Sequence, residues 1–167
     1  MKTYNFKNWS LFLCFTILTL TFSCSKEDNE DNGDGNKIES PSSIENEILK
    51  VVNAHRNSVG DASLSTNTYA NQVAKAHNEY MIDEGKISYD NSADRIQDFY
   101  ANINGLSRVA EAVANRYNSA ESLLEAWLKN ATIKKNIETD DYTHTGISAI
   151  KDNQGTYYFT QILLKIE

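Results

Sequence analysis

Three side chains in this 167-residue sequence could together carry metal or catalytic chemistry: His77, His144 and Glu111. Two imidazoles and a carboxylate can hold Zn²⁺, or can position a water molecule for general-base attack. Each residue also has a structural interpretation, which we favour. His77 lies on an apolar stripe and suits a hydrogen-bonded core position, His144 suits an exposed strand start, and Glu111 could accept backbone hydrogen bonds.

Hydrophobic spacing predicts the helices that would position these residues. Apolar residues recur at helical spacing from Ile44 to His55, so a first helix should start at a cap at Ser42 or Ser43 and end near Gly60. A second helix should run from about Asn67 to Glu84. It would carry His77, be covered on more than one side, and be followed by Gly85 as a C-cap.

The middle of the chain is harder to assign. The segment from Lys86 to Leu106 has no clear period, and "SRVAEAVANRY", which contains Glu111, fits a short strand or a helix. A third helix is clearer, because Asn118 and Glu121 resemble a capping pair before the apolar face at 123–128.

The C-terminal segment predicts a β-hairpin. "HTGISAIKD" and "TYYFTQILLKI" are separated by "NQG", a good turn sequence. The second run is apolar at nearly every residue, which is typical of a strand buried on both faces. Helices should therefore cover both sides of a small antiparallel sheet, giving an α+β fold arranged as a three-layer α-β-α sandwich.

The order of these motifs resembles the bacterial branch of the CAP superfamily, which includes cysteine-rich secretory, antigen 5 and pathogenesis-related proteins with an SCP domain. The resemblance starts in "VVNAHRNSVGDASLSTNTYANQVAKAHNEYMIDEGKISYDNSADR" and continues through "VAEAVA", "AWLKNATIKKNI", "YTHTGISAI" and "YYFTQILL". It spans roughly Ile44 to Ile166 and implies the CAP type of three-layer sandwich.

The resemblance also implies a cleft with two histidines and two acidic groups, and this sequence departs from that set. Tyr89 stands at one histidine position and Ile133 at the other, while Asn130 stands at an acidic position. Only Glu111 remains, so we predict no metal site and no cofactor. A cleft lined by Tyr89, Asn130, Ile133 and His77 would suit a sugar or peptide ligand better than water activation.

The N-terminus predicts an anchor. An apolar run from Leu11 to Phe22 is too short for a good membrane span and reads as part of a secretory signal peptide. Leu20, Ser23 and Cys24 resemble a bacterial lipoprotein lipobox, which implies that Cys24 becomes the lipidated first residue. The alternative is an ordinary secreted protein with a free Cys24.

The expected organisation is a signal peptide at 1–23, a flexible acidic tether at 24–43 and a CAP domain at 44–167. "SKED" after the lipobox cysteine resembles the signal that sends lipoproteins of the Bacteroidota to the cell surface. Without Lys2 and Lys7, 14 basic and 23 acidic residues leave a net charge of −9, which argues against nucleic acid as a partner.

We therefore expect a lipoprotein of the outer membrane, exposed at the cell surface, whose CAP domain is a non-catalytic binding module. Its partners would be the membrane, through lipidated Cys24, and a glycan, peptide, lipid or envelope protein. The alternatives are a hydrolase that acts through Glu111 with unfamiliar partner residues, and a structural envelope component without a ligand.

Overall fold

The computed structural model describes residues 43–167. The predicted signal peptide, the lipobox cysteine and all of the tether except Ser43 lie outside the described residues. The elements, in chain order, are α1 (Ser43–Val59), β1 (Ser65–Thr66), α2 (Thr68–Asp83), α3 (Ser92–Asn102), β2 (Leu106–Asn115), α4 (Ala120–Lys129), α5 (Ala131–Ile137), β3 (His144–Lys151) and β4 (Tyr157–Ile166). Within this range no helix is long and apolar enough to span a membrane.

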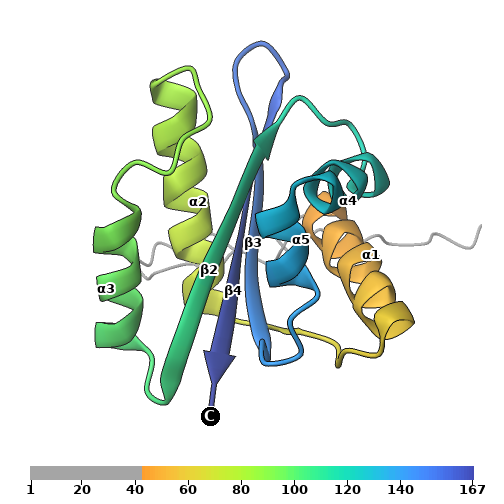
Figure 1. Cartoon of the computed structure of the whole chain (residues 1–167). Coiled ribbons are helices and arrows are strands. Elements are labelled where there is room, and N and C mark those ends of the chain that lie inside the picture. The colour runs from red at the N-terminus through yellow and green to blue at the C-terminus, as the bar shows by residue number, and fades with distance from the viewer. Residues whose placement is uncertain (1–42) are drawn as a thin grey trace, which may run out of the picture. The chain divides into compact units, whose positions relative to one another are not determined.

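The architecture is the predicted three-layer α-β-α sandwich. The sheet has the order β1-β3-β4-β2, with α2 and α3 on one side and α1, α4 and α5 on the other (Figure 1). Strand β4 pairs antiparallel with both β2 and β3, which confirms the hairpin. The short β1 pairs parallel with β3, so the sheet is mixed rather than wholly antiparallel as predicted.

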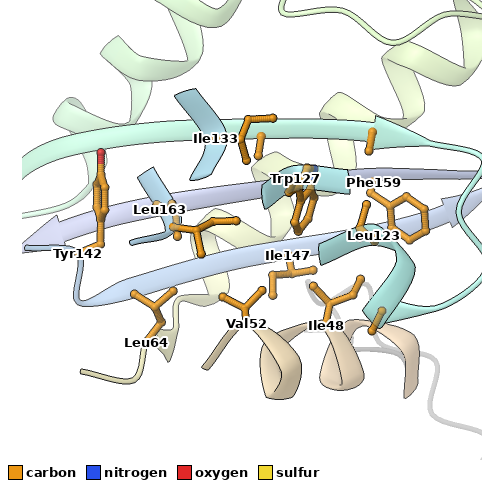
Figure 2. Close-up of a cluster of buried hydrophobic side chains, with 14 residues drawn as sticks. Ile48, Val52, Leu64, Leu123, Trp127, Ile133, Tyr142, Ile147, Phe159 and Leu163 are labelled. Carbon is orange, nitrogen blue, oxygen red and sulfur yellow. The ribbon is translucent and has the colours of Figure 1, made fainter. Parts of the chain in front are cut away.

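Residue alternation along the strands divides the core into two parts. The larger part lies between the sheet and the layer of α1, α4 and α5, where Trp127, Leu123 and Ile48 pack against Phe159 and Leu163 of β4 (Figure 2). The smaller part lies under α2 and α3, with Ile162 and Leu164 of the same strand. Strand β4 is thus buried on both faces, as its composition predicted.

Helix α2 lies directly against β3. A Cβ atom at Gly146 would lie 2.2 Å from the carbonyl carbon of Ala70, far inside van der Waals contact. Only glycine allows this approach, and the small Ala70 and Ala74 on the facing side of α2 are fully buried. The close packing fixes α2, and therefore His77, relative to the sheet.

Several helix predictions are confirmed and others are corrected. Helix α1 starts at Ser43, and α2 is capped by the Asn67 side chain, which accepts from the Ala70 N–H. The predicted cap at Asn118 is wrong by one residue, because Ser119 accepts the capping bond from Ser122 N–H. The segment that contains Glu111, for which the sequence allowed a strand or a helix, is strand β2.

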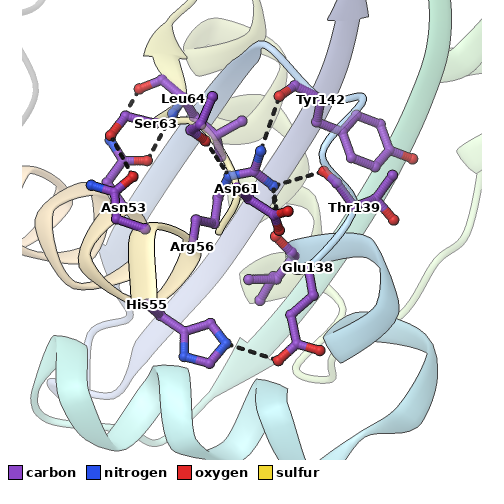
Figure 3. A network of polar contacts seen from close by, with 12 residues as sticks. Asn53, His55, Arg56, Asp61, Ser63, Leu64, Glu138, Thr139 and Tyr142 are labelled. Carbon is purple, nitrogen blue, oxygen red and sulfur yellow. Dashed lines mark hydrogen bonds and ion pairs between the residues drawn. The ribbon is translucent and has the colours of Figure 1, made fainter. Parts of the chain in front are cut away.

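A buried arginine connects the end of α1 to the loops around α5. The Arg56 side chain is fully buried and donates to the carbonyl oxygens of Ala62, Ile137, Thr139 and Tyr142 at 2.7–3.2 Å (Figure 3). Burial lowers the pKa of Arg56, and Asp61 and Asp140 oppose that effect. This one side chain therefore supplies donors to four carbonyl groups, and its bonds to Ile137 and Tyr142 are buried.

Candidate functional site

Glu111 lies in the middle of β2 and faces the layer of α2 and α3. Its neighbours two residues away, Val109 and Val113, pack on that side, whereas Ala110 and Ala112 pack in the core on the other side. Alternation along the strand therefore directs the carboxylate towards α3.

The partner of Glu111 is Arg95, in the first turns of α3. Arg95 Nε donates to Glu111 Oε1 at 3.0 Å, and Arg95 Nη2 donates to Oε2 at 2.8 Å. The side chains of Arg95 and Glu111 are only 14% and 10% exposed. Such a two-point pair is the strongest geometry available to a guanidinium and a carboxylate, so both oxygens of Glu111 are engaged.

Arg95 is the site residue that the sequence reading missed. It lies in the segment that showed no clear period, yet the structure forms α3 there. Its third nitrogen, Nη1, donates to the Asp90 carbonyl oxygen at 2.6 Å and so ties the start of α3 to the preceding loop. The one available signal was a basic residue directly after Asp94, the acidic residue in the first turn of α3, and it does not specify Glu111 as the partner.

His77 projects from α2 next to this ion pair and is buried. Its Nε2 lies 2.9 Å from the Ser88 carbonyl oxygen, which can only accept, so Nε2 carries the proton and donates. Arg95 Nη2 lies 3.3 Å from the same nitrogen, but two donors cannot bond, so we interpret this as a packing contact. The ring stacks on Tyr80 with the centroids 6.0 Å apart.

The protonation state of His77 follows from its surroundings. Burial is the main cause that lowers its pKa from 6.5, and Arg95 lowers the pKa further, while Glu111 and the Ser88 hydrogen bond act in the opposite direction. The imidazole is therefore neutral at neutral pH, with its Nε2 already committed to a backbone carbonyl.

Tyr89 is placed beside the same part of β2. Its side chain is about half exposed, and it shares a hydrogen bond with the Val113 backbone. Desolvation raises the pKa of Tyr89. The negative charge of Glu111 raises the same pKa further, whereas the hydrogen bond with Val113 lowers it. Tyr89, His77, Glu111 and Arg95 thus form one polar group, which we call the Arg95–Glu111 site.

Asn130 and Ile133 do not join this group. The Asn130 side chain caps α5 by accepting from the N–H groups of Thr132 and Ile133 at 3.0 and 3.1 Å. Ile133 is 7% exposed and packs in the core beneath α1, α4 and α5. Strand β2 therefore lies between Ile133 and the Glu111 side chain.

His144 is also separate from the Arg95–Glu111 site. It starts β3 and its Nδ1 lies 2.9 Å from the Thr143 hydroxyl oxygen. Strand β4 lies between β3 and β2, so it separates His144 from Glu111.

The donor set around Glu111 does not fit a zinc ion. Zinc needs about three free nitrogen, sulfur or oxygen ligands from the protein. Here Glu111 is bound to Arg95, His77 Nε2 donates to Ser88, and the other positions hold Tyr89 and Ile133. Across residues 43–167 no three His, Cys, Asp or Glu side chains gather in a way that could hold a metal.

The space beside Glu111 is small. A hollow of about 20 Å³ lies between α3 and β2, bounded by Arg95, Ile96, Phe99 and Val109. A cavity needs about 10–15 Å³ to hold one water molecule, so there is room for a single water. A substrate would not fit, since ligand pockets usually measure at least about 300 Å³.

The chain is similar to several known proteins. It is 27% identical over 126 residues to the uncharacterized membrane protein YlbC of Bacillus subtilis, and the match covers 72% of this chain and 34% of that protein. The chain thus spans about a third of that relative's length.

Solved structures share the fold at low sequence identity. An outer surface protein of Borrelia burgdorferi superposes with a TM-score of 0.65 at 15% identity, over 72% of this chain and 90% of that chain. An extracellular protein of Bacillus anthracis that contains an SCP domain has a TM-score of 0.62 at 20% identity, over 73% of this chain and 40% of that chain.

The family itself is identified by sequence. The model of the cysteine-rich secretory protein family, CAP, matches residues 49–163, from α1 to β4. This match covers more than half of the chain and includes every layer of the sandwich. The protein therefore belongs to the CAP family of cysteine-rich secretory proteins.

Proposed function

We propose that this protein is held on the cell envelope by a lipid on Cys24 and that its CAP domain works as a binding module without hydrolytic chemistry. The observation that carries the second part is the ion pair between Arg95 and Glu111. A general base or a zinc ligand must turn a lone pair towards its target, and each oxygen of this carboxylate already accepts a hydrogen bond from the same guanidinium.

Two further features argue against hydrolytic chemistry at this site. His77, the other candidate base at the site, is buried and donates its Nε2 proton to a carbonyl group. The hollow next to Glu111 accommodates one water molecule and no substrate. A catalytic site would need the base and the reacting bond within hydrogen-bond distance of each other.

A zinc titration tests this part of the proposal. The full chain, in detergent at neutral pH, should bind no stoichiometric Zn²⁺ in a calorimeter, because the site does not bring three free ligands together. Binding at micromolar concentration or tighter would contradict the proposal and bring hydrolysis back. The matched control is His77→Ala, which would lose such binding if this site were responsible.

The envelope location rests on the N-terminal sequence and on the relatives. An apolar run ends in Ser23 and Cys24, and an acidic tether follows. The Borrelia relative is an outer surface protein, and the Bacillus anthracis relative is an extracellular protein. We propose the outer face of the outer membrane for this chain, with "SKED" as its export signal.

Cys24→Ser should release the protein from the membrane. A serine cannot form the thioether to the lipid, so the membrane-bound fraction should fall by at least tenfold on fractionation, and incorporation of labelled fatty acid should be lost. Cys14→Ser is the matched control, because Cys14 lies in the predicted signal peptide and its loss should change neither readout. An unchanged membrane fraction for Cys24→Ser would contradict the anchor.

A further inference from the structure

A second pocket lies away from the Arg95–Glu111 site and is large enough for a ligand. Its volume is about 300 Å³, against about 20 Å³ for the hollow at Glu111. It lies where the end of α2, the residue after β2 and the turn between β3 and β4 come together. In Figure 1 that turn is the blue loop at the top of the molecule. Glu111 lies five residues back along the chain from Arg116, or about 16 Å at the usual rise per residue.

The pocket holds an exposed arginine that has no side-chain partner among residues 43–167. Arg116 lines it, and no ion pair or side-chain hydrogen bond joins its guanidinium to any residue in 43–167. Its backbone has φ +68°, a left-handed conformation that non-glycine residues seldom adopt. The strain is held by the hydrogen bond from the Arg116 N–H to the Tyr157 carbonyl oxygen at 3.0 Å. Strained residues of this kind cluster at ligand sites.

The turn between β3 and β4 gives the pocket a polar lining, and its backbone is held by hydrogen bonds. Asp152 Oδ1 accepts from the N–H groups of Gln154 and Thr156 at 2.9 and 2.8 Å, which fixes the turn. The side chains of Asn153 and Gln154 are exposed at this turn and line the pocket. Each amide offers two N–H donors and one oxygen acceptor.

The remaining lining includes an aromatic ring, a glycine and one aliphatic side chain. Tyr158 is 5% exposed and packs on Met81 and Val113, so its position is fixed by the core. A Cβ atom built at Gly85 would meet nothing within 4 Å, so the pocket is open on that side. Ile82 is the one aliphatic residue among those that line it.

We propose that this pocket binds a sugar that carries a carboxylate, such as a uronic acid unit of an acidic glycan. Arg116 would pair with the carboxylate at two points. The amides of Asn153 and Gln154 and the second oxygen of Asp152 would bond to the hydroxyl groups. The pocket is lined by one cation, Arg116, and one carboxylate, Asp152, so it suits a monoanion better than a phosphate dianion. A peptide side chain would find almost no apolar surface here.

The test is a calorimetric titration of the full chain, in detergent, with D-glucuronate, D-glucose and acetate in separate experiments. Glucuronate should bind at least tenfold more tightly than glucose, which lacks the carboxylate, and than acetate, which lacks the hydroxyl groups. Equal binding of acetate and glucuronate, or no glucuronate binding at 10 mM, would overturn the proposal.

Arg116→Gly makes the test specific to the site. Glycine accepts the left-handed backbone, so the melting temperature should stay the same or rise, while glucuronate binding falls at least tenfold. Lys50→Gln removes one exposed positive charge on α1 and should leave binding unchanged. Undiminished binding by Arg116→Gly would overturn the proposal. Neither variant touches Glu111 or Cys24, so this failure is distinguishable from a failure of the proposed function.

Discussion

Replacing Arg56 with methionine should lower the free energy of unfolding by about 5 kcal/mol, since an orphaned buried carbonyl costs about 1–3 kcal/mol and Arg56 serves two buried and two partly buried carbonyls. Methionine fills similar volume and removes every donor. The carbonyls of Ile137 and Tyr142 are bonded to Arg56 inside the protein, where water cannot replace the lost donor. A domain of this size is stable by about 5–15 kcal/mol, so the loss would remove between about a third and all of that stability.

Urea denaturation measures this effect directly. Arg108→Met is the matched control, because Arg108 is 50% exposed, pairs with Asp141 at 3.1 Å at the surface and lies 6.0 Å from the centroid of the Tyr142 ring. Exposed pairs contribute about 1 kcal/mol or less, so the control should lose little stability. If Arg56→Met were no less stable than Arg108→Met, the buried network would not hold α1 to the loops around α5.

The parts of the fold that could be predicted are those with strong local signals. Helix α2 has both a regular apolar pattern and a side-chain cap at Asn67. The hairpin of β3 and β4 has a turn sequence between two strongly apolar runs. The three layers followed from one property of β4, its apolar residues on both faces.

Helix α3 could not be predicted because its local signals are weak. Its N-cap residue, Asn91, has φ +59° and makes no capping hydrogen bond with its side chain. Two of its large apolar residues, Ile96 and Tyr100, are 38% and 50% exposed, so the apolar stripe does not mark one buried face. The helix is held by tertiary contacts, including Phe99 in the core and the pair from Arg95 to Glu111.

The candidate site shows the same limit. Sequence reading could name Glu111, His77 and Tyr89, which the structure brings together, and also Asn130 and Ile133, which it does not. It could not supply Arg95, because an ion pair between residues 16 positions apart on a helix and a strand leaves no periodic signal. Without Arg95 the carboxylate looks unpaired, and with it both carboxylate oxygens accept hydrogen bonds from a guanidinium.

The pair from Arg95 to Glu111 should give a large coupling energy in a double-mutant cycle. Arg95→Met or Glu111→Leu alone leaves one charge buried without its partner, which should cost about 3 kcal/mol. The double variant removes both charges and fills the space with apolar atoms. It should recover about 2 kcal/mol or more relative to the sum of the single losses. Urea denaturation of the four proteins yields the coupling.

The same cycle separates a structural role for Glu111 from a catalytic one. A carboxylate kept for chemistry is commonly held at a cost in stability, so Glu111→Leu would then leave the free energy of unfolding unchanged or raise it. The matched control is the exposed pair of Arg108 and Asp141, at 3.1 Å, whose coupling should stay at or below about 1 kcal/mol. A coupling at Arg95 and Glu111 no larger than this control, together with a stable Glu111→Leu protein, would contradict the structural role. A large coupling would mean that this CAP domain keeps its glutamate to hold α3 against the sheet.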